Sequence, residues 1–332
     1  MEFSEQMSEA IILDNIRRAL SEHRSFLVCG HEDLDGDCIG SQLGLYHWLT
    51  AEGKQAAVVC AGPTLSNYSF LPGYAQVKSR VPEGFKADVT LCVDTGSAQR
   101  VVPGVRLQGL VVNVDHHPGN TNFGDLNWVD PDAAAVGEMI YILLTGFNRP
   151  LPKDTVTCLY LAILTDTGSF RYSKTSVRTF EVATALVHAG ISPHAIANAY
   201  YDNIHPNTVG LTGEVFSHLH YELDGRLVWG QITHEMYRRC GGLECQPEQL
   251  ASQMRSIRGV EVAVLFHEME DSTGRASLRS RGRVDASIVS AELGGGGHPS
   301  AAGVRFQGDF AANCERILEA VRRHILAQMS AA

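Results

Sequence analysis

The chain has 332 residues, of which 44% are hydrophobic and 19% charged, as expected for a globular protein of about two domains. Its 27 basic and 37 acidic residues give a net charge of −10, which argues against a protein that coats long nucleic acid through a broad basic surface. No apolar run reaches the roughly 18 residues of a membrane-spanning helix, and the first residues lack the pattern of a secretory signal. The eight cysteines form no CxxC pair, so we expect reduced thiols, no membrane contact and a cytoplasmic location.

The N-terminal half of the chain alternates short apolar runs with helical patterns. Buried strands are predicted at 26–29, 56–60, 88–93 and 110–114. An amphipathic helix is predicted over 8–24 and another from about Cys38, whereas 62–82 has the Pro, Gly, Ser and Asn content of a loop. Strands that alternate with helices predict βαβ units, and hence an α/β fold with a mainly parallel sheet flanked by helices.

After residue 133 the pattern is helical to about residue 201, a further helix is predicted to about residue 220, and the pattern then returns to strands. Strands are predicted at 227–232 and 260–267, with a closing helix over 311–329. The segment 203–210 contains Pro and Asn and predicts a break. We therefore expect an N-terminal domain over 1–203, a linker over 204–224 and a smaller C-terminal α/β domain over 225–332.

Carboxylates and imidazoles follow the predicted elements at four places. They are His31, Asp35 and Asp37; Asp94; Asp115, His116 and His117; and Asp166. Because the chemistry of open α/β sheets gathers at the carboxyl ends of strands, these groups are candidates for one site. Oxygen ligands with a minority of imidazoles suit Mn²⁺ or Mg²⁺. Two such ions about 3.5–4 Å apart would neutralise the carboxylates and activate water for attack on phosphorus.

Each of these clusters taken alone has a structural alternative. Asp35-Gly36-Asp37 is a common turn, in which Gly36 permits a sharp bend that aims both carboxylates the same way. Asp94 and Asp166 each precede Thr and Gly, and would equally serve as turn formers or helix N-caps. The paired histidines would fit a tight surface turn. The order of the four clusters and their placement at the ends of elements favour a metal site.

In these motifs the sequence resembles the DHH phosphoesterase superfamily, named for the triplet present here as Asp115-His116-His117. The family's first motif, His-x-x-x-Asp-x-Asp, is matched by 31–37, with Leu34 where the family often has proline. This departure costs loop rigidity but removes no ligand. Asp94 and Asp166 match the second and fourth motifs.

The resemblance implies two divalent cations, with Mn²⁺ preferred and Mg²⁺ as the alternative, and with Asp94 shared between them. The ligands of one ion would be His31, Asp35 and Asp94, and those of the other Asp37, Asp94, His116 and Asp166. His117 would face the phosphate as a catalytic residue. Asp115 would orient and electrostatically support the triplet.

A glycine run near the C-terminus, Gly294 to Gly297 followed by His298, is similar to the signature of the DHH-associated domain. Such a run is either a flexible turn or a place where backbone approaches a phosphate closely. Arg279 and Arg281 on a preceding predicted strand are either solvated or fork-shaped donors to a phosphate or carboxylate. The expected substrate-binding residues are Arg279, Arg281, Gly295, Gly296, Gly297 and His298.

Other branches of the superfamily carry additional domains or membrane segments that we do not find in these 332 residues. The chain therefore most resembles the compact nano-RNase (oligoribonuclease) type. The resemblance implies hydrolysis of short RNA to 5′-mononucleotides by a 3′–5′ exonuclease, and of 3′-phosphoadenosine 5′-phosphate (pAp), in a cleft between the two domains. Alternatives are a soluble phosphodiesterase of linear or cyclic dinucleotides and a non-catalytic nucleotide sensor, although no metal ligand is missing. A homodimer is compatible with the resemblance. Preferred substrate, polarity and metal identity stay open.

Overall fold

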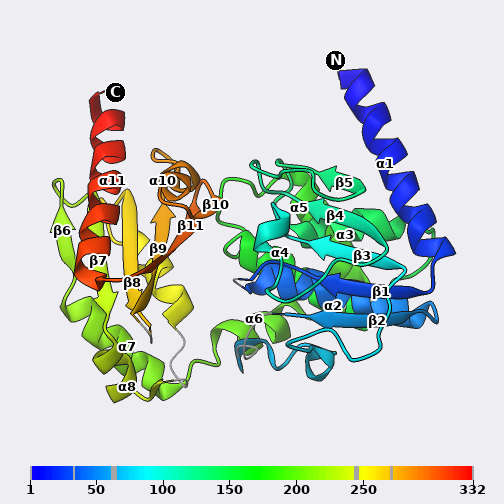
Figure 1. The fold of residues 1–332 in the computed structure, drawn as a ribbon, viewed down its shortest axis with the longest axis horizontal. Helices are drawn as coiled ribbons and strands as arrows, with labels where there is room; N and C mark the ends of the chain where they lie inside the picture. Colours follow the sequence, from blue (N-terminus) through cyan, green and yellow to red (C-terminus); the bar gives the residue numbers. More distant parts are fainter. Residues whose placement is uncertain (1, 33, 61–65, 243–246, 270–271, 331–332) are drawn as a thin grey trace. The chain divides into compact units, whose positions relative to one another are not determined.

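The computed structural model describes residues 2–32, 34–60, 66–242, 247–269 and 272–330. It divides into two compact units, Met1–Asn203 and Ile204–Ala332, which are described separately (Figure 1). Within the described residues, no helix combines the length and the apolar character needed to cross a membrane.

The N-terminal unit is built on a parallel sheet. Its strands are β1 (Ser25–Cys29), β2 (Gln55–Val59), β3 (Val89–Val93), β4 (Leu110–Asp115) and β5 (Leu126–Val129). They lie in the order β2-β1-β3-β4-β5, and every neighbouring pair is parallel. The mainly parallel sheet predicted from the sequence is thereby confirmed. Strand β5 was not predicted, because it is short and only Trp128 in it is buried.

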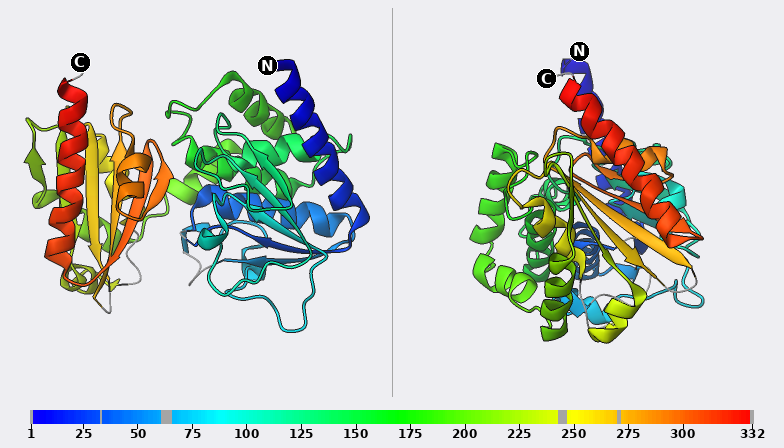
Figure 2. Two further views of the ribbon diagram at one scale, coloured as in Figure 1. Left: turned by 45° about the horizontal axis from the view of Figure 1, so that its top comes forward. Right: turned by 90° about the vertical axis from the view of Figure 1, so that its left-hand side faces the viewer.

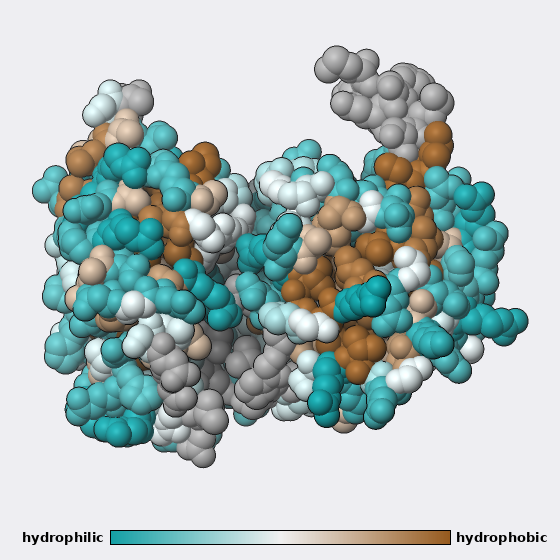
Figure 3. Space-filling view, in the orientation of Figure 1, coloured by the Kyte–Doolittle hydropathy of each residue, from teal (hydrophilic) through white to brown (hydrophobic). Residues whose placement is uncertain are grey.

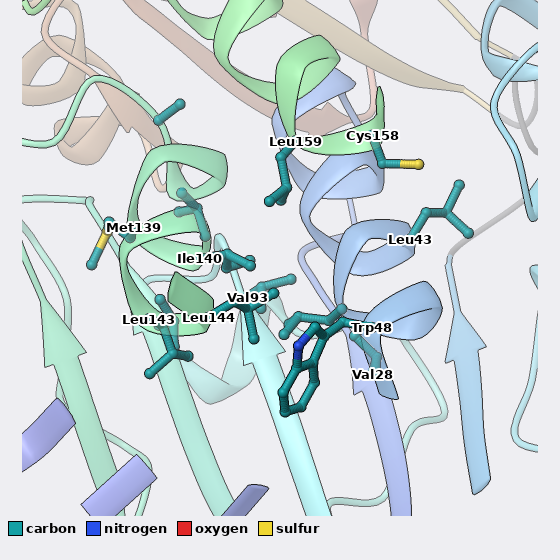
Figure 4. Close-up of a cluster of buried hydrophobic side chains, with 14 of the residues drawn as sticks. Val28, Leu43, Trp48, Val93, Met139, Ile140, Leu143, Leu144, Cys158 and Leu159 are labelled. Atoms are coloured by element: carbon teal, nitrogen blue, oxygen red, sulfur yellow. The ribbon is translucent and has the colours of Figure 1, made fainter. Parts of the chain in front are cut away.

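Helices cover one face of this sheet. They are α1 (Glu2–Glu22), α2 (Gly36–Ala51), α3 (Val136–Thr145), α4 (Lys153–Asp166), α5 (Val177–His188) and α6 (Pro193–Tyr201). Figure 4 shows side chains of α2, α3 and α4 packed against Val28 of β1 and Val93 of β3. The opposite face is covered by apolar side chains from 81–107, such as Val102. The predicted loop over 62–82 contains the short 3₁₀ helices η1 (Ser66–Tyr68) and η2 (Tyr74–Gln76), and 61–65 lies outside the described residues.

A row of glycines sets how closely α2 approaches α4. Gly36, Gly40 and Gly44 are spaced four residues apart, so they lie on one face of α2. A Cβ added at Gly36 would lie 2.4 Å from Oγ1 of Thr165, and one at Gly40 would lie 2.6 Å from the carbonyl oxygen of Cys158. The two backbones can therefore pack together only because these positions carry no side chain. This contact places the start of α2 beside the end of α4.

The C-terminal unit contains a mixed sheet in the order β10-β11-β9-β8-β7-β6. Its strands are β6 (His220–Glu222), β7 (Leu227–Ile232), β8 (Val262–Glu268), β9 (Thr273–Ser280), β10 (Gly296–His298) and β11 (Ala301–Gln307). Its helices are α7 (Pro206–Ser217), α8 (His234–Arg239), α9 (Leu250–Arg255), α10 (Ala286–Glu292) and α11 (Phe310–Ser330). Helix α11 lies along one face of the sheet (Figure 2), and α7 and α9 pack on the other. The predicted second α/β domain is present.

The segment 204–224, which we expected to be a linker with a helix to about residue 220, forms helix α7 and strand β6. Pro206 stands in the first turn of α7, where a helix needs no backbone N–H group from it. Leu211 and Val215 of this helix are buried in the core of the C-terminal unit. The Pro-Asn pair that was read as a break therefore marks the start of a helix.

Most of the surface is polar, with some apolar side chains exposed. In the N-terminal unit these include Ile11 of α1 and Val177 and Phe180 of α5, which are 57%, 76% and 52% exposed. Figure 3 shows apolar surface gathered on this unit on the face in view.

The close approach of α2 to α4 predicts opposite effects for two Gly→Ala substitutions. Gly40→Ala should lower the free energy of unfolding by about 1–3 kcal/mol, because the new methyl group overlaps a backbone carbonyl of α4. Gly213→Ala on α7 has open space around it and should raise stability by about 0.5–1 kcal/mol. Urea unfolding followed by circular dichroism measures both. A Gly40→Ala protein as stable as the parent would contradict the packing argument.

Candidate metal centre

The carboxyl ends of three neighbouring strands bring the N-terminal motifs together. His31 follows β1 by two residues, Asp94 follows β3 directly, and Asp115 ends β4. Because β1, β3 and β4 are adjacent and parallel, these ends meet at one edge of the sheet. The start of α2 and the end of α4 add Asp37 and Asp166. Contacts of 2.7–3.8 Å connect the whole set: His31, Asp35, Asp37, Asp94, Asp115, His116, His117 and Asp166.

Asp94 lies at the middle of this cluster and faces both sides of it. Its Oδ2 is 3.3 Å from Nε2 of His31, and its Oδ1 is 3.6 Å from Nε2 of His116. Asp94 is 2% exposed, and its Oδ1 accepts no hydrogen bond from the described residues. Its backbone is left-handed, with φ of 55°, while its N–H group donates to the carbonyl of Val114. A strained, buried carboxylate of this kind is typical of a functional position.

His116 is held so that one ring nitrogen faces the carboxylates. Its Nδ1 lies 3.0 Å from the carbonyl oxygen of Ala133, so Nδ1 carries the proton and donates it. Its Nε2 lies 3.8 Å from Asp37 Oδ2 and 3.5 Å from Asp166 Oδ2. The backbone contact therefore fixes the tautomer in which Nε2 is available to a metal ion.

Asp35 and Asp37 reach the cluster from the start of α2, but their carboxylates accept hydrogen bonds from different helices. Asp35 is the N-cap, with Oδ1 accepting a hydrogen bond of 2.9 Å from the N–H group of Cys38. Asp37 accepts hydrogen bonds of 2.6 and 2.9 Å from the N–H groups of Val136 and Gly137, at the start of α3. The positive end of the α3 dipole thus fixes the Asp37 carboxylate.

The expectation that Gly36 bends the chain to aim both carboxylates the same way is not met. Asp35 Oδ2 lies 3.7 Å from His31, whereas Asp37 Oδ2 lies toward His116. Gly36 is the first residue of α2 and has no left-handed φ. A glycine is needed at position 36 because the side chain of Thr165 leaves no room for a Cβ atom, and not because the backbone forms a turn.

Within the cluster, the buried Asp115 and the half-buried His117 form a pair. Nδ1 of His117 lies 2.7 Å from Oδ1 of Asp115, which is fully buried. The other oxygen of Asp115 accepts a hydrogen bond of 2.6 Å from Asn120, and Asn120 also donates to Asn113. Burial alone would raise the pKa of Asp115, but the hydrogen bond from His117 lowers it. Burial lowers the pKa of His117. The pair is therefore an anionic carboxylate that orients a neutral imidazole.

Among the residues that the structure describes, too few positively charged groups lie near the cluster to balance its carboxylates. Burial, with the charge of Asp37, raises the pKa of Asp94 to about 8. Burial, with Asp37 and Asp35, raises the pKa of Asp166 well above its usual range. Burial would lower the pKa of His31, but the carboxylates of Asp35 and Asp94 raise it. Divalent cations fit this donor set of oxygens and imidazoles, and they would replace the missing positive charge.

The predicted substrate residues lie in the C-terminal unit, on and beside a hairpin. Gly297 pairs with Ala302, and His298 pairs with Ala301, in the antiparallel pair β10–β11. Ala301 pairs in turn with Arg279 of β9. Arg279 and His298 therefore lie on the same face of the sheet, with strand β11 between them. Of the glycine run, which we expected to be either a flexible turn or a close backbone approach to a phosphate, Gly296 and Gly297 belong to the paired strand β10. A Cβ at Gly295 would lie 2.1 Å from the carbonyl oxygen of Gly303.

Arg279 and Arg281 differ in their surroundings. The guanidinium group of Arg281 donates to the carbonyl groups of Arg255, Ser256 and Ile257, at the end of α9. Arg281 therefore stabilises the C-terminus of a helix. Arg279 donates from Nε to Ser252 Oγ at 3.3 Å and lies on the same face as His298. No role was expected from the sequence for Ser41, which donates to Asp37, or for Asn120, which donates to Asp115.

Comparisons with known proteins agree with this geometry. The model of the DHH family N-terminal domain matches residues 25–163, and that of the DHHA1 domain matches 246–326. The chain belongs to the DHH family of phosphoesterases. More closely, it is 34% identical to the bifunctional oligoribonuclease and PAP phosphatase NrnA of Thermus thermophilus, over 90% of this chain and 89% of the relative.

Two further comparisons cover most of the chain. The protein of the same name from Bacillus subtilis is 30% identical over 86% of this chain and 90% of its own. The crystal structure of an exopolyphosphatase-related protein from Bacteroides fragilis covers 96% of this chain and 98% of its own, with a TM-score of 0.82 and 23% identity. The latter likeness concerns the fold alone.

The crowding around Asp94 predicts that metal ions stabilise the protein. Mn²⁺ at about 100 times its dissociation constant should raise the free energy of unfolding by about 2.7 kcal/mol or more. Asp94→Asn should remove this gain, because Asp94 faces both His31 and His116. Asp154→Asn, at the other end of α4, is the matched control and should keep it. Thermal unfolding with and without Mn²⁺, together with metal analysis, measures the effect. Two bound ions and an unchanged gain in Asp94→Asn would refute this role.

Proposed function

We propose that the protein is a metal-dependent phosphoesterase that hydrolyses short RNA to 5′-mononucleotides and also removes a phosphate from pAp. The observation that carries the proposal is the position of Asp94, whose two carboxylate oxygens face His31 on one side and His116 on the other. A carboxylate in this position suits a bridge between two ions. The relatives named oligoribonuclease and PAP phosphatase support the substrate class.

We assign the residues around Asp94 to two cation positions. His31 and Asp35 would hold one ion with Asp94, and Asp94 would be shared. The second position would be formed by Asp37, Asp94, His116 and Asp166. Bound divalent cations, Mn²⁺ in our proposal, would polarise the phosphate and acidify the attacking water. The chain's own groups set where the ions and the phosphate lie.

His117 is the residue proposed to act on the phosphate. Its Nδ1 is held by Asp115, so the opposite nitrogen, Nε2, points away from that carboxylate. A neutral imidazole oriented in this way can bind a phosphate oxygen or exchange a proton with the leaving oxygen. Asp115 holds the ring in place, and Asn120 in turn holds Asp115. Asp115 is therefore a positioning residue.

The C-terminal unit would bind the part of the substrate that does not react. Arg279 and His298 lie on one face of the sheet, with the small side chain of Ala301 between them in register. A guanidinium group and an imidazole are suited to a phosphate group. The seven free cysteines among the described residues support a cytoplasmic location. A homodimer stays a prediction.

A substrate panel tests the proposed activity. The Mn²⁺-loaded protein should hydrolyse pAp and RNA of two to five residues, with 5′-mononucleotides as the products of RNA. The same panel includes linear and cyclic dinucleotides, and Asp94→Asn protein purified in parallel controls for contaminating nucleases. Turnover of cyclic dinucleotides alone would assign the phosphodiesterase alternative. Binding of nucleotides without any turnover would assign a sensor.

The substrate contacts proposed for Arg279 predict a loss that depends on the substrate. Arg279→Ala should lower kcat/KM on dinucleotides and pAp by about one to two decades, because a charge-assisted hydrogen bond contributes about 1.5–3 kcal/mol. His298→Ala should act in the same direction. Metal content should not change, and a small generic phosphodiester should be affected far less. Arg283→Ala, an exposed arginine nearby, is the control. Equal losses on both substrates would show that these residues support the fold instead.

A further inference from the structure

A thiol lies within the metal centre beside the proposed position of the first ion. The sulfur of Cys38, a ring nitrogen of His31 and a carboxylate oxygen of Asp94 all lie within 4.8 Å of one another. All three residues are buried, and Cys38 is 0% exposed. Cys38 occupies the position directly after Asp37 in the first turn of α2. Neither the motif nor the comparisons give it a role.

The sulfur of Cys38 is held in this place by neighbouring polar groups. Nε2 of Gln42 donates to Cys38 Sγ at 3.1 Å, and the thiol of Cys60 donates to Oε1 of Gln42 at 3.0 Å. A Cβ added at Gly30 would lie 2.2 Å from the sulfur, so the glycine at this position leaves the space that the sulfur occupies. The sulfur thus accepts a hydrogen bond from an amide that is itself fixed. This fixes its position beside His31 and Asp94.

The spacing of the three groups is close to that of a metal ion's ligands. With Zn–S bonds of about 2.3 Å and Zn–N or Zn–O bonds of about 2.0–2.2 Å, ligand atoms on a tetrahedral ion lie roughly 3.3–3.7 Å apart. His31 and Asp94 already meet this spacing, with 3.3 Å between Nε2 and Oδ2. A displacement of about an ångström would bring the sulfur within the same range. Asp94 Oδ1 is buried and accepts no hydrogen bond from the described residues, so the centre offers a further donor atom.

We propose that Cys38 is an additional ligand at this centre, used by thiophilic ions such as Zn²⁺ and Co²⁺ together with His31 and Asp94, and not by Mn²⁺. The inference rests on the metal centre of the proposed function. Thiolate prefers soft and borderline ions, whereas Mn²⁺ prefers oxygen. In the binding step the S–H bond breaks, an S–metal bond forms and the proton leaves to water, without any change of oxidation state. Cys38 therefore gives this centre a Zn²⁺ affinity that its oxygen and nitrogen donors alone would not have.

Cobalt provides a readout that does not depend on activity. The full chain, freed of resident ions by a chelator, is titrated with Co²⁺ while the near-ultraviolet absorption is followed. A thiolate-to-cobalt charge-transfer band should appear in the parent protein and in Cys158→Ser, a matched change of another buried cysteine. The band should be absent in Cys38→Ser and in Cys38→Ala. Two variants are used so that a folding defect in one does not decide the outcome.

Competition between ions completes the test. Zn²⁺ affinity should fall about tenfold or more in Cys38→Ser, because a metal-ligand bond is lost, while Mn²⁺ affinity should stay within about twofold. Persistence of the cobalt band in Cys38→Ser would overturn the inference. So would a parent protein that binds Mn²⁺ and turns over substrate but shows no band with Co²⁺. A parent protein that binds no Mn²⁺ would instead overturn the proposed metal centre, and the inference with it.

Discussion

The constraint on which the structure depends is the gathering of carboxylates around Asp94. Four aspartates and two histidines converge there from different strands and helices. Asp37, Asp94, His31 and His116 are buried, whereas Asp35 is exposed to water. Buried carboxylates repel one another, and this arrangement is stable only if cations are present or protons are retained. The rest of the N-terminal unit can be understood as a scaffold that holds these groups in place against their repulsion.

The scaffold uses backbone groups as much as side chains. The start of α3 donates two N–H groups to Asp37, and the carbonyl group of Ala133 accepts from His116. These contacts orient one carboxylate and one imidazole without placing further charged side chains at the site. The close packing of α2 on α4 at Gly36 and Gly40 then fixes the distance between the helices that carry Asp37 and Asp166. The packing of these two helices therefore sets the relative positions of two of the candidate metal ligands.

Much of the N-terminal unit could be predicted from the sequence, because its signals are local. Strand β3 consists of four apolar residues and one threonine, all buried, and Asp94 follows it directly. The contact between Asn120 and Asp115 spans five residues, so a search for short-range partners could have found it. The backbone partners of Asp37 could not be found in this way, because a backbone N–H group is the same at every residue. The α2–α4 contact depends on the tertiary packing of Gly40.

The C-terminal unit was harder to predict for a related reason. Hydrophobic periodicity needs side chains, and Gly296 and Gly297 have none, so strand β10 left no pattern. Pro and Asn are common both in loops and at the start of a helix, so the Pro-Asn pair at the start of α7 did not distinguish the two. Arg281 could be assigned to a helix end only once the position of α9 was known. The structures of β10, α7 and the surroundings of Arg281 therefore depend on contacts with distant parts of the chain, which the local sequence does not show.

The hairpin that carries His298 has a consequence for changes in chain length. Side chains alternate between the two faces of a strand, so a shift of one residue in the pairing of β10 with β11 would turn His298 to the opposite face from Arg279. The two residues between the strands, Pro299 and Ser300, set this register. A single insertion or deletion there that shifts the pairing would separate the imidazole from the arginine. The length of this turn therefore determines, as much as the side chains themselves, whether Arg279 and His298 share the face that we propose binds the substrate.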